Sequence, residues 1–140
     1  MQESNRRTRR WFAFAALGLA ACRESAPPVE PFPETVAGVW RRTAVGDLPV
    51  SEAPDPVPRS SVRRLRTAVY EGPGQVQARA YELDSSAVGL DLAQRWRPSA
   101  DTVFFNAGRY FVVVKWQQAD RQALQELVRA IERRLGPGGR

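Results

Sequence analysis

Residues 110–114 (Tyr-Phe-Val-Val-Val) constrain the fold more than any other stretch, because they form a nearly continuous apolar run. A strand with apolar side chains at successive positions belongs in the middle of a sheet rather than at its edge. The segments 102–105 and 109–116 flank Asn106-Ala107-Gly108, and glycine in the third place suits a three-residue hairpin loop that ends in a left-handed residue. The sequence therefore predicts a hairpin whose second strand is central.

The segment after this hairpin carries the clearest helix pattern in the chain. Asp120 is a good N-cap residue, and Gly136 followed by Pro137 is a strong stop signal. The apolar residues between them follow the spacing of one buried helix face; they are Leu124, Leu127, Val128, Ile131 and Leu135. We predict a helix up to residue 135 with Leu127 in the middle of its buried face.

A second hairpin is predicted earlier in the chain. The alternating segments 66–71 and 75–83 flank Gly72-Pro73-Gly74, which is a typical turn sequence. Side chains alternate between the two faces of a strand, so Val76, Ala78 and Ala80 share one face and Gln77, Arg79 and Tyr81 share the other. One face is expected to meet the core, and the other to be wetter.

A second helix is predicted directly after this hairpin. Asp84 or Ser85 can cap its start, and Pro98 enforces a stop after about residue 97. Its apolar stripe consists of Val88, Leu92, Ala93 and Trp96. Gly89 weakens the helix interior by about 1 kcal/mol relative to alanine, and close packing would explain its presence.

The predicted domain thus repeats a unit of two strands and one helix. Segment 36–45 adds a further strand, the proline-rich segment 49–58 is expected to be a long surface loop, and residues 58–65 are expected to form a short helix. We predict an α+β fold in which a small antiparallel sheet of four to five strands, with two hairpins, has two main helices packed on one face. Residues 36–136 form this single domain, and residues 137–140 a disordered tail.

The N-terminal segment has the layout of a secretory signal. Four arginines among residues 6–10 precede an uncharged apolar run over residues 11–21. This run is too short for a membrane-spanning helix, which needs about 20 residues. Leu19-Ala20-Ala21-Cys22 resembles the lipobox of bacterial lipoproteins, in which the cysteine thiol receives a diacylglycerol, with fatty acids such as palmitate, and becomes the first mature residue.

The lipobox implies that residues 1–21 are a signal peptide and that a membrane anchor at Cys22 holds the chain in the cell envelope. Residues 22–35 contain four prolines, so we expect an extended tether that contributes no core, in which Phe32 either docks on the domain edge or stays unpacked. A chain beginning near Glu34 is then predicted to fold alone. The residue after the cysteine is Arg23 and not the aspartate that favours retention in the inner membrane. We therefore expect the anchor in the outer membrane, with the domain facing the periplasm. Export by the general secretory or the twin-arginine route stays open.

Composition narrows the chemistry of the mature chain. Removal of residues 1–21 leaves 17 basic and 14 acidic residues, a formal charge of +3 instead of +6. Nucleic-acid binding usually needs a concentrated basic face, and none is obvious, so no nucleic acid is expected. The chain has no histidine, and its one cysteine is the lipidation site. We therefore expect no cofactor, no metal site and no catalytic residues.

For several charged residues, a structural role is a simpler interpretation than a functional site. Asp84, Asp91 and Asp101 match no calcium loop, and capping or solvent exposure explains them. Lys115 stands between apolar residues, and a buried lysine can have a depressed pKa, but a strand-end lysine that reaches water is the simpler interpretation. The densest basic cluster is Arg63, Arg64 and Arg66; it could touch anionic lipid headgroups, but such clusters are usually solvated.

Aromatic residues supply the candidate binding face. The domain is rich in tryptophan and tyrosine, and any left on the open face of the sheet would mark a partner or ligand site. We select Trp40, Tyr81 and Trp116, with Tyr81 first. The chain is accordingly expected to be a non-catalytic envelope lipoprotein that binds a protein partner or has an assembly role. The alternative is a binding domain for a small apolar or cell-wall ligand, which a large enclosed pocket would favour.

Parts of the domain also resemble an uncharacterised family of bacterial envelope proteins, a domain of unknown function often found behind lipoprotein signals. The resembling stretches are residues 66–70, 75–78, 87–89 and 108–114, roughly half of the mature chain. They include no catalytic motif. The resemblance implies a small α+β envelope domain and no particular activity.

Overall fold

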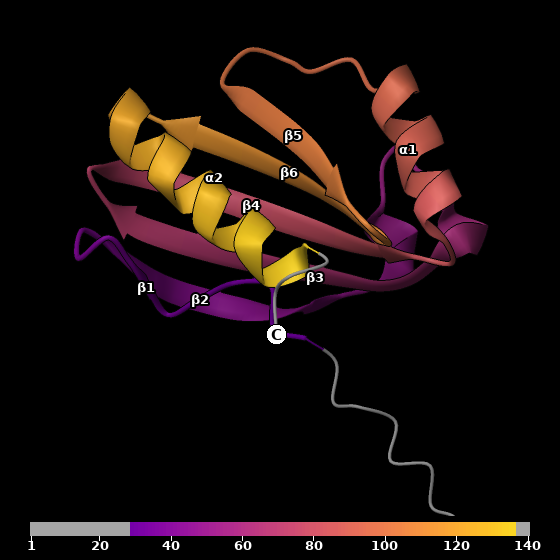
Figure 1. Ribbon diagram of the computed structural model, residues 1–140, viewed down its shortest axis with the longest axis horizontal. Helices are drawn as coiled ribbons and strands as arrows, with labels where there is room; N and C mark the ends of the chain where they lie inside the picture. Colours follow the sequence, from indigo (N-terminus) through magenta and orange to yellow (C-terminus); the bar gives the residue numbers. More distant parts are fainter. Residues whose placement is uncertain (1–28, 137–140) are drawn as a thin grey trace, which may run out of the picture.

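The computed structural model describes residues 29–136, so the predicted signal peptide, Cys22 and the predicted tail at 137–140 lie outside the described residues. The described chain forms one six-stranded antiparallel sheet and two α-helices (Figure 1). The α+β class and the antiparallel sheet are confirmed, with six strands instead of four to five. No helix among residues 29–136 is long and apolar enough to cross a membrane.

The strands are ordered β1-β2-β3-β4-β6-β5 across the sheet. Their bounds are β1 Thr35–Val36, β2 Trp40–Leu48, β3 Val62–Gly72, β4 Gly74–Leu83, β5 Thr102–Ala107 and β6 Tyr110–Gln117. The predicted hairpins are β3–β4 and β5–β6, and the apolar strand β6 lies between β4 and β5 as expected. The predicted strand 36–45 is divided between β1 and β2 by a turn.

The turn of the β3–β4 hairpin depends on Gly74. Its φ is 146°, a backbone conformation that residues with a side chain rarely adopt. A Cβ atom at this position would lie 2.7 Å from Cα of Ala119. The hairpin tip also receives a backbone hydrogen bond from the N–H of Asp120 to the carbonyl oxygen of Pro73, 3.2 Å long. The tip is therefore held against the start of the last helix.

The two helices form where the sequence predicts them. Helix α1 spans Ser86–Arg95, and the Ser85 hydroxyl accepts a hydrogen bond from the backbone N–H of Val88 at 3.4 Å. Helix α2 spans Arg121–Leu135, and the Asp120 carboxylate accepts one from the N–H of Ala123 at 2.9 Å. Both caps satisfy N–H groups that have no partner within the helix.

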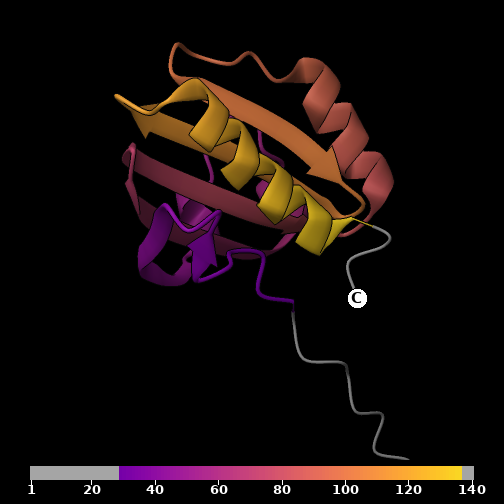
Figure 2. The same ribbon diagram turned by 60° about the vertical axis from the view of Figure 1, so that its left-hand side comes forward.

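The helices pack on opposite faces of the sheet, which corrects the expectation of one face. Helix α2 shares a core with alternate residues of β6, Val112 and Val114, together with Tyr70 and Val76. Helix α1 packs with the intervening residue Phe111 and with Tyr81 and Leu83. The apolar run of β6 is buried on both faces for this reason. Figures 1 and 2 show α2 lying along the sheet and α1 beside the β5–β6 turn.

Close approach at this turn explains the glycine in α1. A Cβ atom on Gly89 would lie 3.4 Å from the carbonyl oxygen of Gly108, in the loop between β5 and β6. Gly108 has the expected left-handed conformation, with φ 55°. The loop itself is shorter than the predicted three residues, because β5 continues to Ala107.

The predicted helix at 58–65 is wrong. Only Arg59–Ser61 form a single 3-10 turn, and β3 begins at Val62. Val62 pairs with Leu83 of β4, so pairing with the sheet overrides the local helical preference. The preceding loop is not merely a surface crossing, because Ala53 and Val57 are buried against the α1 side of the sheet.

The segment before β1 is part of the packed domain, which corrects the tether boundary at residue 35. Phe32 is 0% exposed and belongs to the core beneath α2. Its carbonyl oxygen accepts a hydrogen bond from Arg42 Nη1 at 2.6 Å, and the carbonyl oxygen of Pro33 accepts one from the Tyr70 hydroxyl at 2.6 Å. Glu30 forms an ion pair with Arg66. The fold therefore begins near residue 30, before the predicted start at 36.

Candidate functional site in the open half of the sheet

The sheet face opposite α2 is covered at one end only. In the covered end, Leu65, Tyr81 and Phe111 lie opposite one another on β3, β4 and β6 and are buried. Trp96, just after α1, packs on them, with its ring centroid 5.1 Å from that of Phe111 and 6.4 Å from that of Phe104. These aromatic contacts and the 49–58 loop close this end to water.

The remainder of this face, which we call the open half, carries polar side chains in register. One row across the sheet places Thr67 beside Arg79 and Val113. The next row runs Val69, Gln77, Lys115 and Thr102, and the outermost runs Glu71, Gln75 and Gln117. Moving along the strands away from α1, the face changes from buried aromatic to exposed amide and charged side chains.

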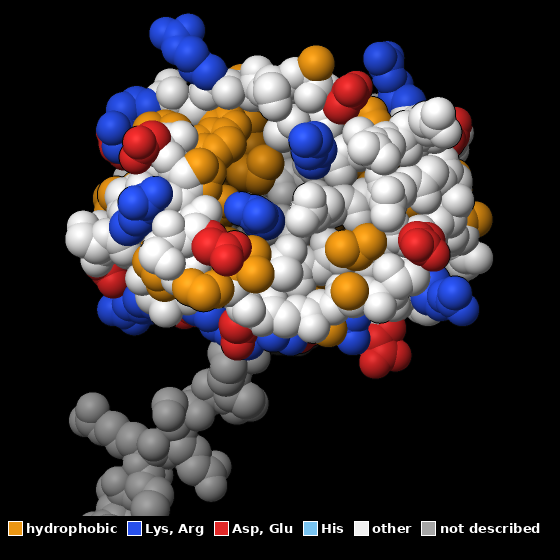
Figure 3. Space-filling model, turned by 180° about the vertical axis from the view of Figure 1, so that it is seen from behind, with side chains coloured by type: hydrophobic (Ala, Val, Ile, Leu, Met, Phe, Trp, Pro, Cys, Tyr) orange, Lys and Arg blue, Asp and Glu red, His pale blue; other side chains and the backbone are white. Residues whose placement is uncertain are grey.

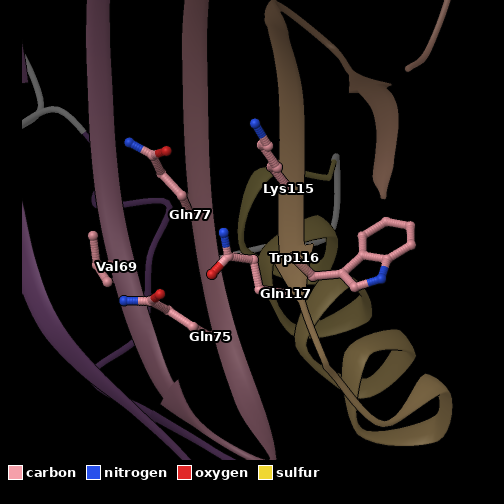
Figure 4. A pocket seen from close by; sticks show the side chains of 6 residues that line it. All are labelled: Val69, Gln75, Gln77, Lys115, Trp116 and Gln117. Atoms are coloured by element: carbon pink, nitrogen blue, oxygen red, sulfur yellow. The ribbon is translucent and has the colours of Figure 1, made fainter. Parts of the chain in front are cut away.

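Two adjoining hollows occupy the open half. The outer hollow has a volume of about 310 Å³ and is lined by glutamines of β4 and β6, Lys115 and Val69. Figure 4 shows these side chains on one side of the sheet, whereas Trp116 points to the other side. The inner hollow, about 280 Å³, lies against Trp96 and Tyr81 and shares Gln77 and Lys115 with the outer one. The two hollows therefore form one trough along β4 and β6.

Figure 3 views the molecule from this side. Hydrophobic side chains gather around a hollow toward the α1 end, and lysine or arginine side chains lie at its rim. The rest of this face consists mainly of uncharged polar side chains and backbone. The trough is thus apolar at its α1 end, polar along the rest of its length, and open to solvent on one side.

Three cations line the inner hollow, from three different elements. They are Arg79 of β4, Lys115 of β6 and Arg97 of the α1–β5 loop. Within residues 29–136, none of the three has a carboxylate oxygen within 4.0 Å, and no aspartate or glutamate lines either hollow. The nearest acidic residue in register is Glu71, at the outer end beside Gln75. The inner hollow is therefore a positively charged site.

Two further groups, the indole of Trp96 and the phenol of Tyr81, determine which hydrogen bonds the inner hollow can form. The indole Nε1 of Trp96 is buried and has no hydrogen-bond partner among the described residues. Such a donor is costly to leave unpaired, by about 1–3 kcal/mol. Burial raises the pKa of Tyr81, and the neighbouring Arg79 partly offsets this rise, so the phenol stays neutral at physiological pH. Donors and cations, rather than acceptors, dominate this end of the trough.

The predicted binding face of three aromatic residues does not exist as a single surface. Trp40 and Tyr81 are each 1% exposed, on opposite sides of the sheet. Alternation placed Tyr81 on the correct face, but α1 and the 49–58 loop cover it there. Trp40 lies beneath α2, where its Nε1 donates to the carbonyl oxygen of Ala123 at 2.8 Å.

Trp116 is the one of the three that reaches the surface. It is half-buried on the α2 side and lines a separate groove of about 700 Å³ between α2 and β5. The rim of this groove carries charges of both signs, including Arg121 and Glu132. The indole of Trp116 therefore belongs to a different surface from the open half, although this residue also contributes to the lining of the outer hollow.

The other charged residues considered from the sequence have ordinary roles. Arg63 pairs with Asp84 at 3.0 Å, and Arg64 pairs with Asp47 at 2.9 Å, so the basic cluster is largely neutralised. Arg64 and Arg66 hold the pKa of Asp47 below its usual value, and burial opposes them. No three aspartate or glutamate side chains within residues 29–136 lie close enough to hold a metal ion.

Sequence reasoning placed Gln77 on the face of its strand opposite Val76, but it did not identify the glutamines of the open half as a candidate site. Their signal was a gradient at alternate positions of β4, where Leu83 and Tyr81 are followed on the same face by Arg79, Gln77 and Gln75. Strand β6 shows the same gradient from Phe111 to Gln117. Comparisons with protein families, with curated proteins and with solved structures find no match to this chain.

Proposed function

We propose that this chain is a lipoprotein of the bacterial cell envelope whose domain binds a protein partner through the open half of the sheet. The observation that carries the binding role is the incomplete cover of this face. Helices, loop and N-terminal segment bury much of β3, β4 and β6, but the trough along β4 and β6 keeps its amides and cations accessible. Polar groups arranged in register on a rigid sheet are a suitable binding surface.

The proposed anchor constrains where the partner lies. Only residues 23–28 separate Cys22 from the first described residue, and the chain packs into the domain from Glu30. The distance from Cys22 to Val29 is at most about 25 Å in a fully extended chain. A lipid at Cys22 would therefore keep the domain close to the membrane, so the partner is expected to be a membrane protein or a protein at the membrane surface.

The anchor is tested by replacing the cysteine. Cys22→Ala is expected to abolish incorporation of labelled palmitate and to leave the signal peptide uncleaved. The control is Ser25→Ala, a substitution three residues after the cysteine that leaves the lipobox intact. Unchanged palmitate labelling of the Cys22→Ala chain would contradict the lipoprotein assignment.

The binding surface is tested by photo-crosslinking in cells. A photoreactive amino acid at Gln77 is expected to give a defined adduct that Lys115→Glu weakens. The matched control is the same amino acid at Gln122, an exposed position on α2, on the opposite side of the sheet. Identical adducts from the two positions, or none from Gln77, would contradict a partner in the open half.

A small cell-wall ligand is the second candidate, and the inner hollow favours it. Its volume of about 280 Å³ and its wall of Trp96, Ser99 and Thr102 suit one sugar or peptide unit. This alternative predicts a raised melting temperature with soluble cell-wall fragments. It also predicts that Trp96→Phe abolishes the shift, whereas Trp116→Phe, in the separate groove, leaves it intact.

A further inference from the structure

We infer that the trough of the open half binds an extended, acidic segment of the partner protein, with a carboxylate in the inner hollow. The inference rests on the proposed binding role of this face and names the chemistry of the partner. It follows from three observations: the charge of the inner hollow, the unpaired indole N–H beside it, and the shape of the trough.

The charge of the inner hollow calls for an anion. Arg79 and Lys115 stand on neighbouring strands two residues out of direct register, which places their Cβ atoms about 7–8 Å apart. Arg97 approaches from the α1–β5 loop, on the other wall. A single carboxylate between them would accept charge-assisted hydrogen bonds from two or three cations, which are stronger than bonds between neutral groups.

Elsewhere on the domain, five arginines have such partners, whereas others, Arg41, Arg109 and Arg121 among them, have no carboxylate oxygen within 4.0 Å among residues 29–136. Four of the five form an ion pair with an N–O distance of 3.0 Å or less: Arg63, Arg64, Arg66 and Arg95. In the trough, the corresponding carboxylate is absent from the lining residues. A ligand that supplies it completes an arrangement that the protein uses on its other surfaces.

The unpaired donor is the second observation. The buried Nε1 of Trp96 has no acceptor among residues 29–136, and Trp96 forms a wall of the same hollow. A carboxylate has two oxygens and can accept several hydrogen bonds. A carboxylate bound in this hollow supplies an acceptor of the kind that this N–H lacks, whereas a neutral hydrocarbon ligand supplies none.

The shape of the trough favours an extended chain over a compact anion. The two hollows share Gln77 and Lys115 and follow β4 from Tyr81 to Gln75, which corresponds to about 20 Å at 3.3 Å per residue. Along the outer part, Gln75, Gln77 and Gln117 offer both donors and acceptors. Such amides match the alternating C=O and N–H groups of a peptide backbone about six residues long.

Peptide binding to the full-length mature lipoprotein in neutral detergent micelles tests this inference. The probe is a fluorescently labelled, capped (Glu-Ala)4 peptide, compared with (Gln-Ala)4 of the same length. We expect the acidic peptide to bind at least about tenfold more tightly than the neutral one. Arg79→Gln and Lys115→Gln are each expected to weaken its binding by about tenfold, and Arg133→Gln, on the last turn of α2, to leave it unchanged.

Tryptophan fluorescence locates the bound peptide. Binding is expected to shift the emission of the wild-type protein, and Trp96→Phe to remove the shift while Trp116→Phe retains it. Equal affinity for both peptides, or an equal loss with Arg133→Gln, would overturn the inference. Tighter binding of inorganic phosphate or of a cell-wall muropeptide than of (Glu-Ala)4 would also overturn it. A Gln77 adduct in cells together with no acidic-peptide binding would leave the proposed function standing and refute only the charge.

Discussion

The two faces of the sheet differ in how completely they are covered. On the α2 face, β4 is apolar from Val76 to Ala80, and Val76, Ala78 and Ala80 are all buried. On the other face, the same strand changes from Leu83 and Tyr81 to polar residues. This strand thus carries buried apolar residues through its middle on one face, whereas on the other face the apolar residues end midway. On the face opposite α2, the last apolar residue of this strand marks where the covering elements end and the accessible surface begins.

The cover on the two faces also has different origins. The α2 face is closed by a long amphipathic helix and by the N-terminal segment around Phe32. The opposite face is closed by a shorter helix, α1, and by the 49–58 loop. The shorter elements leave the trough exposed. Substitutions should therefore cost most beneath α2 and least in the open half.

The largest effect is expected at Phe32, the residue through which the N-terminal segment joins the core. Phe32→Ala should lower the free energy of unfolding by about 3–5 kcal/mol, because a fully buried aromatic side chain leaves a cavity. Urea denaturation measures the change, with Val29→Ala, at a 45% exposed position, as the control. A chain starting at Glu34 should be destabilised similarly. Equal urea denaturation midpoints for Phe32→Ala and the wild type would indicate that this segment is a loose tether.

Leu127 tests the buried face of α2. It is 0% exposed, and Leu127→Ala is expected to cost about 2–5 kcal/mol. Gln125→Ala, on the exposed side of the same helix, should change stability by less than about 0.5 kcal/mol. Denaturation midpoints of the two variants provide the measurement. If they coincide, α2 does not bury the face that its periodicity indicates.

Local patterns predicted the elements better than their packing. The cap at Asp120 and the spacing of Leu124, Leu127 and Ile131 define α2 within the chain itself, and the structure agrees. The burial of Phe32 depends on Tyr70 and Arg42, which lie on other strands, so local sequence alone left open whether this residue docks on the domain or stays unpacked. The continuous apolar run of β6 indicates that both faces of this strand are covered. It does not indicate that α1 covers one face and α2 the other.

The candidate site was hidden for a related reason. The binding face predicted from the sequence consists of aromatic residues, and large aromatic side chains in a small domain are mostly buried. Tyr81 illustrates this, because its face was assigned correctly while its cover comes from α1, beyond the strand itself. The trough is built from glutamines and cations that are unremarkable singly. Only strand register brings Gln77 beside Lys115.

Tyr70 offers an intermediate test that also depends on pH. Tyr70→Phe removes the hydroxyl that donates to the carbonyl oxygen of Pro33, and should cost about 1–3 kcal/mol at neutral pH. Burial raises the pKa of Tyr70 above its ordinary value near 10. The contribution of the neutral phenol is therefore complete below about pH 10 and declines as pH rises above it. The stability difference between the wild type and Tyr70→Phe should narrow in that range; a difference that grows above pH 10 would contradict this assignment.

The smallest effect on stability is expected in the open half, at Gln77. Its side chain is exposed, so Gln77→Ala should change the free energy of unfolding by less than about 0.5 kcal/mol. The adjacent Val76 points to the α2 face and is 0% exposed, so Val76→Ala should cost about 1–3 kcal/mol. These neighbours on one strand compare the two faces directly. A cost at Gln77 that matches the cost at Val76 would mean that the open half is structural. A negligible cost together with weaker binding of (Glu-Ala)4 would mean that its glutamines serve the ligand, because a surface residue that does not stabilise the fold can still lower affinity when it contacts the bound chain.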